Sequence, residues 1–135
     1  MTITLCGSIK FMDQMQAIQK KLEEMGHVVL MPIKAAGVDY WSEDNRSRVE
    51  AKKKFEFINE HLDKIEVSDA ILVVNMTKGD IENYVGANTF LETGFAHYRQ
   101  KKIYLLNPLP NLQYIRDEIE TIDPVIINGD LSLVV

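Results

Sequence analysis

Hydrophobic residues along the chain fall into short, mostly apolar runs that alternate with longer stretches of helical spacing. A continuous apolar run of four or five residues is typical of a strand buried on both faces of a sheet. Between the runs, apolar residues recur at intervals of three and four, which predicts helices. The predicted strands are residues 3–6, 27–31, 70–74, 103–106 and 124–127, and the predicted helices are residues 11–25, 44–65, 86–100 and 112–121.

The regular alternation of strand and helix predicts an α/β fold. We expect a doubly wound, flavodoxin-like or Rossmann-like sheet of five parallel strands with helices on both faces, in one domain over residues 1–135. Ligands of such sheets bind beyond the carboxyl ends of the strands. Residues 7–10, 75–89 and 107–111 are predicted to reach that edge. The residues expected to face the core from the helix over 44–65 are Val49, Phe55, Ile58, Leu62 and Ile65.

Composition and charge exclude several classes of protein. Hydrophobic residues make up 46% and charged residues 26%, as in soluble globular proteins. The net charge of −5 disfavours binding to a nucleic-acid polymer or to an anionic membrane. No apolar run is long enough to cross a bilayer. Cys6 is the only cysteine, which excludes an intrachain disulfide and favours the reducing cytoplasm. No local spacing of ligands indicates a metal site, and we expect no metal and no cofactor.

The first strand ends at Gly7-Ser8, immediately before a helix. Glycine permits a sharp turn, and the free N–H groups of a helix start favour an anion such as a phosphate, assisted here by Ser8 and Lys10. A simpler interpretation is that Ser8 only caps the helix. The sequence leaves both interpretations open.

Glu92 lies among apolar residues in the predicted helix over 86–100, an unusual setting for a solvated carboxylate. Thr89 lies three positions earlier, on the same side of the helix. Gly94 is expected to let a ligand or another backbone approach closely. A carboxylate held in a crevice acts as a nucleophile or as a general acid–base. The alternative is an acidic residue that stabilises the start of the helix through its dipole.

Other candidate residues carry weaker signals. His61 is predicted at the inner edge of its helix, either as a partly buried structural histidine or as a group that carries a proton near neutral pH. Tyr40 and Trp41, in the loop over 33–43, either stack on a flat base or cover the core.

Three segments together resemble the nucleoside 2-deoxyribosyltransferase superfamily, including its deoxynucleoside 5′-monophosphate N-glycosidase branch. They are residues 5–10 (LCGSIK), 61–74 (HLDKIEVSDAILVV) and 85–96 (VGANTFLETGFA). The resemblance extends over residues 3–107. It implies that Glu92 is the nucleophile and that Gly7, Ser8 and Ile9 bind a 5′-phosphate. It also implies a homodimer or a larger homo-oligomer.

The resemblance implies cleavage of the N-glycosidic bond of a (deoxy)nucleoside or nucleoside 5′-monophosphate, by hydrolysis or base exchange through a glycosyl-enzyme intermediate. His61 stands where the superfamily has an aspartate, and we expect it to protonate the departing base. Gly86, Asn88 and Thr89 are expected, with Lys10, to contact a sugar hydroxyl or a phosphate oxygen.

Two other functions compete with this one. A non-catalytic nucleotide-binding or sensing domain of the same fold is the main alternative, since Thr89-Phe90-Leu91-Glu92 also resembles half of a motif in the "lonely guy" phosphoribohydrolase family. A flavodoxin-like electron carrier or a receiver domain fits less well. Those proteins need a Ser/Thr-rich first turn or an acidic residue after a central strand, and the third predicted strand is followed by Asn75.

Overall fold

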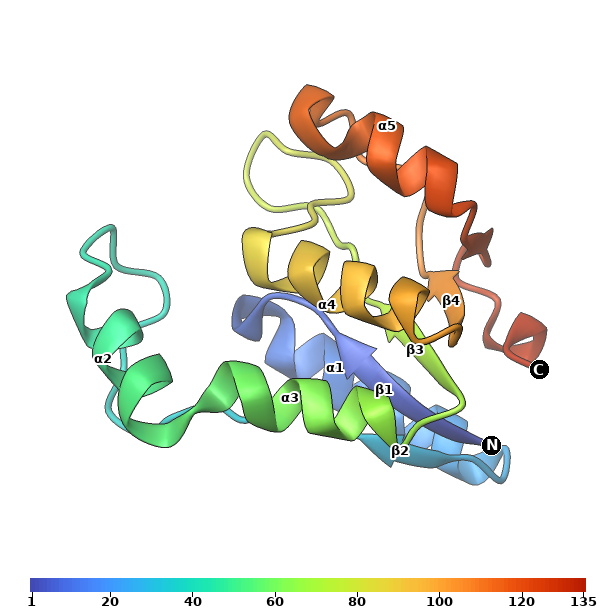
Figure 1. The fold of residues 1–135 in the computed structure, drawn as a ribbon, viewed down its shortest axis with the longest axis horizontal. Coiled ribbons are helices and arrows are strands. Elements are labelled where there is room, and N and C mark those ends of the chain that lie inside the picture. The colour runs from blue at the N-terminus through green and yellow to red at the C-terminus, as the bar shows by residue number, and fades with distance from the viewer.

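The structure is a computed structural model that describes the backbone of residues 1–135 and all side chains except those of Lys54 and Phe55. Its five strands form one parallel sheet in the order β2-β1-β3-β4-β5 (Figure 1). This confirms the predicted doubly wound α/β fold. The elements are β1 (Thr2–Cys6), η1 (Ile9–Phe11), α1 (Met12–Glu24), β2 (Val28–Leu30), α2 (Arg46–Phe55), α3 (Phe57–Glu66), β3 (Ala70–Val73), α4 (Ala87–Tyr98), β4 (Lys102–Leu105), α5 (Gln113–Ile122), β5 (Val125–Ile126) and η2 (Leu131–Leu133).

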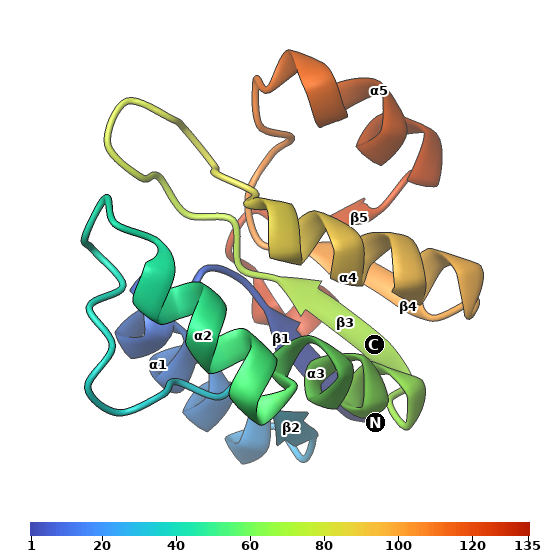
Figure 2. The same cartoon turned by 60° about the vertical axis from the view of Figure 1, so that its left-hand side comes forward.

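Side chains of the central strands point alternately to the two faces of the sheet, as the period of a strand requires. On β3, Leu72 packs into a core with α1, whereas Ile71 and Val73 pack into a second core with α3, α4 and α5. Figure 2 shows α3 and α4 on the near side of β1 and β3, with α1 on the far side. Burial on both faces explains why these strands are continuous apolar runs in the sequence.

The predicted helix over residues 44–65 is two helices. Glu56 lies between α2 and α3 in the left-handed backbone region, with a φ of 51°, and this breaks the helical hydrogen bonding. Of the residues expected to face inward, Ile65 is fully buried, whereas Val49 and Ile58 are exposed. The side chain of Phe55 lies outside the described residues. The break lets α2 stand away from the sheet (Figure 1), over the edge where the strands end.

The carboxyl ends of β3 and β4 are joined by a buried asparagine. The Asn75 side chain donates hydrogen bonds to the backbone carbonyls of Asn107 and Pro108, at 2.9 and 3.0 Å, and accepts one from the Asn107 N–H at 2.9 Å. Both N–H donors of the Asn75 amide and one lone pair of its oxygen are therefore used. Asn75 has a structural role here, which explains an asparagine after this strand.

No helix in the described part of the chain combines the length and the apolar character needed to cross a membrane.

Gly26 has a φ of 94° just after α1, which confirms it as the residue that ends the first helix.

Gly7 allows the end of β1 to approach β3 closely. A Cβ atom at this position would lie 3.1 Å from the Val74 carbonyl oxygen and 3.3 Å from the Val74 Cβ. Gly94 is different: a Cβ there would meet no described atom of the chain within 4 Å, so no other backbone segment of the chain approaches Gly94, and a ligand contact there stays a prediction. Gly7 is needed for space between two strands, whereas Gly94 lies on an open surface of α4.

The two glycines predict opposite effects of the same substitution. Gly7→Ala forces a methyl group against Val74 in the middle of the sheet, and we expect it to lower the free energy of unfolding by about 1–3 kcal/mol. Gly94→Ala places a better helix former in open space and should raise it by about 0.5–1 kcal/mol. Urea unfolding of both variants tests this, and a stable Gly7→Ala protein would contradict the tight contact.

Candidate active site

A cavity of about 320 Å³ opens at the carboxyl ends of β1 and β3, where the order of the strands reverses. Residues 7–10 line it, as the sequence predicted, and so do residues 78, 84 and 86–89 of the predicted segment 75–89. Residues 107–111 do not line it, because they follow β4, which β3 separates from β1 in the sheet. The rest of the wall comes instead from residues 32, 33 and 40, from Arg48 and Lys52 of α2, and from Phe57, Ile58 and His61 of α3.

Glu92 points from α4 into this cavity with only 15% of its side chain exposed. Burial raises the pKa of Glu92 to about 8, and its interactions with the Cys6 thiol and with the charge of Lys52 only partly oppose this effect. The carboxyl group is therefore mostly protonated at neutral pH when no ligand is bound. No acidic residue lies in the first turn of α4, so the alternative of a residue that stabilises the helix dipole is wrong.

His61 lies on α3 directly opposite Glu92. Its Nε2 atom is 3.8 Å from Glu92 Oε2 and 3.6 Å from Cys6 Sγ. Burial and the nearby charge of Lys64 lower the pKa of His61 to about 4, although a backbone interaction with Leu5 acts in the opposite direction. The imidazole is thus neutral near pH 7. We expected His61 to carry a proton at this pH; its lowered pKa disfavours that, whereas the raised pKa of Glu92 favours a proton on the carboxyl group.

Cys6 completes a buried group of three side chains. It is fully buried, and burial together with the neighbouring Glu92 raises the pKa of its thiol well above the ordinary value. The donor atoms of Cys6, His61 and Glu92 all lie within 4.8 Å of one another. Spacing along the sequence did not predict this group, because its three members come from β1, α3 and α4 and are far apart in the chain.

The turn after β1 contributes Gly7, Ser8, Ile9 and Lys10 to the cavity wall. The Ser8 hydroxyl accepts a hydrogen bond from the Lys10 N–H at 3.3 Å, so Ser8 does cap the short helix that follows. Ser8 nevertheless lines the same cavity as Glu92. Capping and contact with a ligand are compatible, because a hydroxyl has a second lone pair and a donor proton to offer.

The start of α4 faces the cavity from the other side. Gly86 is the N-cap residue and gives no side-chain hydrogen bond to the helix, so N–H groups of the first turn are free for a ligand. Gly86, Asn88 and Thr89 all line the cavity. Thr89 is buried, and its backbone carbonyl accepts a hydrogen bond from the Thr93 hydroxyl at 2.7 Å. Asn88 is exposed at the rim.

Four cationic side chains among the described residues line the cavity, and only Lys10 was predicted from the sequence. The others are Arg48, Lys52 and Lys78. Burial lowers the pKa of Lys10, and the neighbouring charges of Lys78 and Arg48 lower it further, despite the opposing charge of Asp39. Like charges held together in an otherwise acidic protein favour an anionic ligand. The three missed residues lie on α2 and on the loop after β3, and only the tertiary structure brings them to Lys10.

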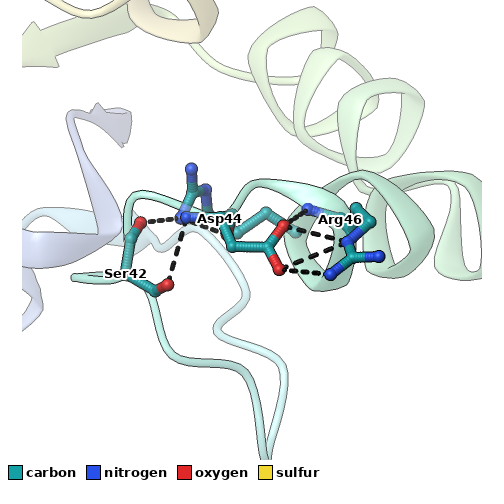
Figure 3. Close-up of polar contacts among 4 residues, drawn as sticks. Ser42, Asp44 and Arg46 are labelled. Carbon is teal, nitrogen blue, oxygen red and sulfur yellow. Dashed lines mark hydrogen bonds and ion pairs between the residues drawn. The ribbon is translucent and has the colours of Figure 1, made fainter.

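The segment before α2 contacts Arg48, which lines the cavity. Figure 3 shows Ser42, Asp44 and Arg46 at this point of the chain. The Asp44 carboxylate accepts hydrogen bonds from the Arg46 guanidinium, and Arg48 donates to the backbone carbonyls of Ser42 and Asp44. These carbonyl contacts orient Arg48, whose charge lowers the pKa of the nearby Asp44, but Arg48 forms no salt bridge with any described residue. A phosphate in the cavity would form one.

The two aromatic residues of this segment have different surroundings. Tyr40 lines the cavity, and its hydroxyl accepts a hydrogen bond from the Ala35 N–H at 3.0 Å. Trp41 is 66% exposed, and the Lys10 ammonium lies 5.1 Å from the centre of its ring. The interpretation that Trp41 covers the core is therefore wrong, whereas Tyr40 lies where it can contact a ligand.

Two solved structures are similar to this fold. A 2-deoxyribosyltransferase from the psychrotolerant bacterium Bacillus psychrosaccharolyticus has 17% sequence identity and a TM-score of 0.56, over 80% of this chain and 73% of the other. The CMP N-glycosidase BcmB of Clostridium botulinum has 18% identity and a TM-score of 0.55, over 95% of this chain and 90% of the other. No protein-family model and no curated protein matches the chain. The structural likeness confirms, for the fold, the resemblance that the sequence motifs indicated.

The cation cluster predicts that a simple anion stabilises the protein. Inorganic phosphate should raise the melting temperature, because it relieves the repulsion among Lys10, Lys78 and Arg48. Lys78→Met should raise the dissociation constant for phosphate about tenfold, as expected for loss of one charge-assisted hydrogen bond. Lys20→Met, on the exposed face of α1, is the matched control. Equal stabilisation of both variants by phosphate, in a thermal-shift titration, would contradict an anion site at the cluster.

Proposed function

We propose that the protein cleaves the N-glycosidic bond of a nucleoside 5′-monophosphate, with Glu92 as the nucleophile. One observation carries this proposal: the buried Glu92 carboxyl group and a cluster of cations line the same cavity. A nucleotide needs a reactive group at its anomeric carbon and a positively charged site for its phosphate. The volume of about 320 Å³ is in the range of small-molecule sites.

The phosphate is proposed to bind between the Gly7-Ser8 turn and the charges of Lys10, Arg48 and Lys78. Lys10 and Lys78 are each held against an aromatic ring, Lys10 on Trp41 and Lys78 on Tyr84 at 4.5 Å. Such contacts restrict the two long side chains before a ligand arrives, which reduces the entropy lost on binding. A nucleoside without a phosphate would leave this charge uncompensated. We therefore infer a preference for the monophosphate over the nucleoside.

The sugar is proposed to lie between this cluster and Glu92, with Thr89 and Asn88 near its hydroxyl groups. The Glu92 carboxylate attacks C1′ as the bond from C1′ to the base nitrogen breaks, through an oxocarbenium-like transition state. An ester between Glu92 and the sugar results, and water or a second base resolves it. Burial excludes screening water, so the carboxylate also stabilises the positive charge that develops on the sugar.

Glu92 and His61 together hold the one proton that this reaction needs. Near neutral pH the raised pKa of Glu92 favours a proton on its carboxyl group, and His61 Nε2, which lies 3.8 Å from Glu92 and 3.6 Å from Cys6 Sγ, is the proposed acceptor. Transfer to His61 produces at once the carboxylate that attacks C1′ and an imidazolium that protonates the departing base. Positive charge developing on the sugar favours this transfer, because it stabilises the ionised form of Glu92.

The structural neighbours support this class of reaction. One is described as a 2-deoxyribosyltransferase and the other as a CMP N-glycosidase. Both names denote enzymes that act on the bond between a base and a sugar. The homodimer implied by the sequence motifs stays a prediction, as does a cytoplasmic location.

Substitution of the nucleophile tests the proposal. Purified protein should release free base from a panel of nucleosides and nucleoside 5′-monophosphates. Glu92→Gln should lower kcat/KM at least about 1000-fold, because an amide cannot form the glycosyl ester. The matched control is Glu118→Gln on the exposed face of α5, which should be fully active. Chromatography of the released base measures both.

Two outcomes would overturn this assignment. Unchanged base release by Glu92→Gln would remove Glu92 from the mechanism. Thermal stabilisation of the wild-type protein by nucleotides, with no base released from any of them, would favour the non-catalytic nucleotide-binding domain.

The proton shared by Glu92 and His61 predicts a bell-shaped pH dependence of kcat/KM. Below about pH 4 His61 binds a second proton while Glu92 keeps its own, so the carboxylate is missing. Above about pH 8 Glu92 loses the shared proton, and none is left for the departing base. The two apparent pKa values belong to the pair rather than to either residue alone. A rate that is flat from pH 6 to pH 10 would contradict the shared proton.

A further inference from the structure

We propose that Cys6, His61 and Glu92 form a binding site for a divalent transition-metal ion of the zinc type. Sulfur, imidazole nitrogen and carboxylate oxygen are the three donor types that zinc binds in proteins. A thiolate and an imidazole favour such an ion over magnesium or calcium, which prefer oxygen alone. The three donor atoms lie within 4.8 Å of one another in the structure.

The distances fit tetrahedral coordination. With a bond of about 2.3 Å to sulfur and about 2.0 Å to nitrogen, a tetrahedral zinc ion holds the two donors about 3.5 Å apart. Cys6 Sγ and His61 Nε2 are 3.6 Å apart. The corresponding separation of nitrogen and oxygen donors is about 3.4 Å, and His61 Nε2 and Glu92 Oε2 are 3.8 Å apart. The Cys6 and Glu92 donor atoms lie within 4.8 Å of each other, so the Glu92 carboxylate has to move toward the other two ligands to complete the geometry.

Burial holds two of the three ligands in place before a metal binds. Cys6 is fully buried and His61 is 5% exposed, so neither side chain has other rotamers to search. They project from β1 and from α3, and α3 packs against β1 on one face of the sheet. Only Glu92, at the cavity wall, has to adjust.

The charges of the site also balance. Binding displaces the proton of the Cys6 thiol and that of the Glu92 carboxyl group into solvent, and the resulting thiolate and carboxylate neutralise the two charges of the ion. A neutral cluster is much less costly to bury than an isolated charge. Lys52 acts electrostatically on Glu92 and Lys64 acts on His61, and both oppose the metal. We therefore expect weaker binding than at a structural zinc site with four protein ligands.

The fourth coordination position opens on the cavity, because His61 and Glu92 line the cavity and Cys6 lies behind them. A water molecule or a ligand atom can occupy it. If the proposed function is right, the metal ties up the carboxylate that attacks the sugar, and a zinc ion then inhibits base release until a chelator removes it. This consequence rests on the proposed function, but metal binding itself does not.

Cobalt binding to the folded protein tests the site without any activity measurement. Protein treated with a chelator and then freed of it is titrated with Co²⁺, and Zn²⁺ is then added in competition. We expect one Co²⁺ per chain, a sulfur-to-cobalt charge-transfer band in the near ultraviolet, intense visible bands typical of tetrahedral cobalt, and loss of all of them when Zn²⁺ displaces Co²⁺.

Variants identify the ligands. Cys6→Ala should abolish the charge-transfer band. His61→Asn and Glu92→Gln should each raise the dissociation constant for Co²⁺ at least about tenfold. Glu92→Gln keeps the size of the side chain, so it remains informative if Cys6→Ala fails to fold. His97→Asn, at an exposed histidine of α4, is the matched control and should bind cobalt as the wild type does. Absence of a charge-transfer band in the wild type, or binding lost only in His97→Asn, would overturn the proposal.

Discussion

The pairing of β1 with β3 is the constraint on which the site depends. Cys6, the last residue of β1, lies opposite Val73, and the chain then turns through Gly7 against Val74 with no room for a side chain. This pairing joins residues nearly 70 positions apart in the sequence. It places the turn after β1 and the start of α4 on two sides of one cavity. Because both strands are buried on both faces, neither can slide without exposing apolar side chains.

The cavity separates two kinds of electrostatic environment. On one side, Lys10, Lys78 and Arg48 raise the local positive charge in a protein whose net charge is −5. On the other, Glu92 and His61 are buried deeply enough that the neutral form of each is favoured. A molecule with an anionic end and a reactive carbon at some distance from it matches both. Nucleoside monophosphates have this construction.

The group formed by Cys6, His61 and Glu92 has two proposed chemical uses that exclude each other. In the proposed glycosidic cleavage, Glu92 and His61 pass a proton between a carboxyl group and an imidazole. With a metal bound, the same lone pairs would be coordinated and neither group could act on a sugar. The His61 imidazole, beside a thiol and a carboxyl group, supplies the nitrogen donor of the proposed zinc site.

Much of the fold followed from the order of apolar runs, because burial on both faces requires apolar residues wherever a strand is central. Glu92 was identified for a similar local reason: an acidic residue among apolar neighbours indicates a carboxylate held away from solvent. The break at Glu56 was missed, since the helical spacing of apolar residues continues through it. The prediction that residues 107–111 reach the cavity was wrong, because β3 separates β4 from β1 in the sheet.

The sequence by itself determined which strands are central, where the first turn lies and which carboxylate is buried, because each of these depends on residues close together in the chain. Only the tertiary structure decided the charge state of His61, the gathering of Arg48, Lys52 and Lys78 around Lys10, and the approach of Cys6 to His61 and Glu92. These properties depend on distances between side chains of different elements. Electrostatic interaction and metal coordination act over a few ångströms in space, whatever the separation along the chain.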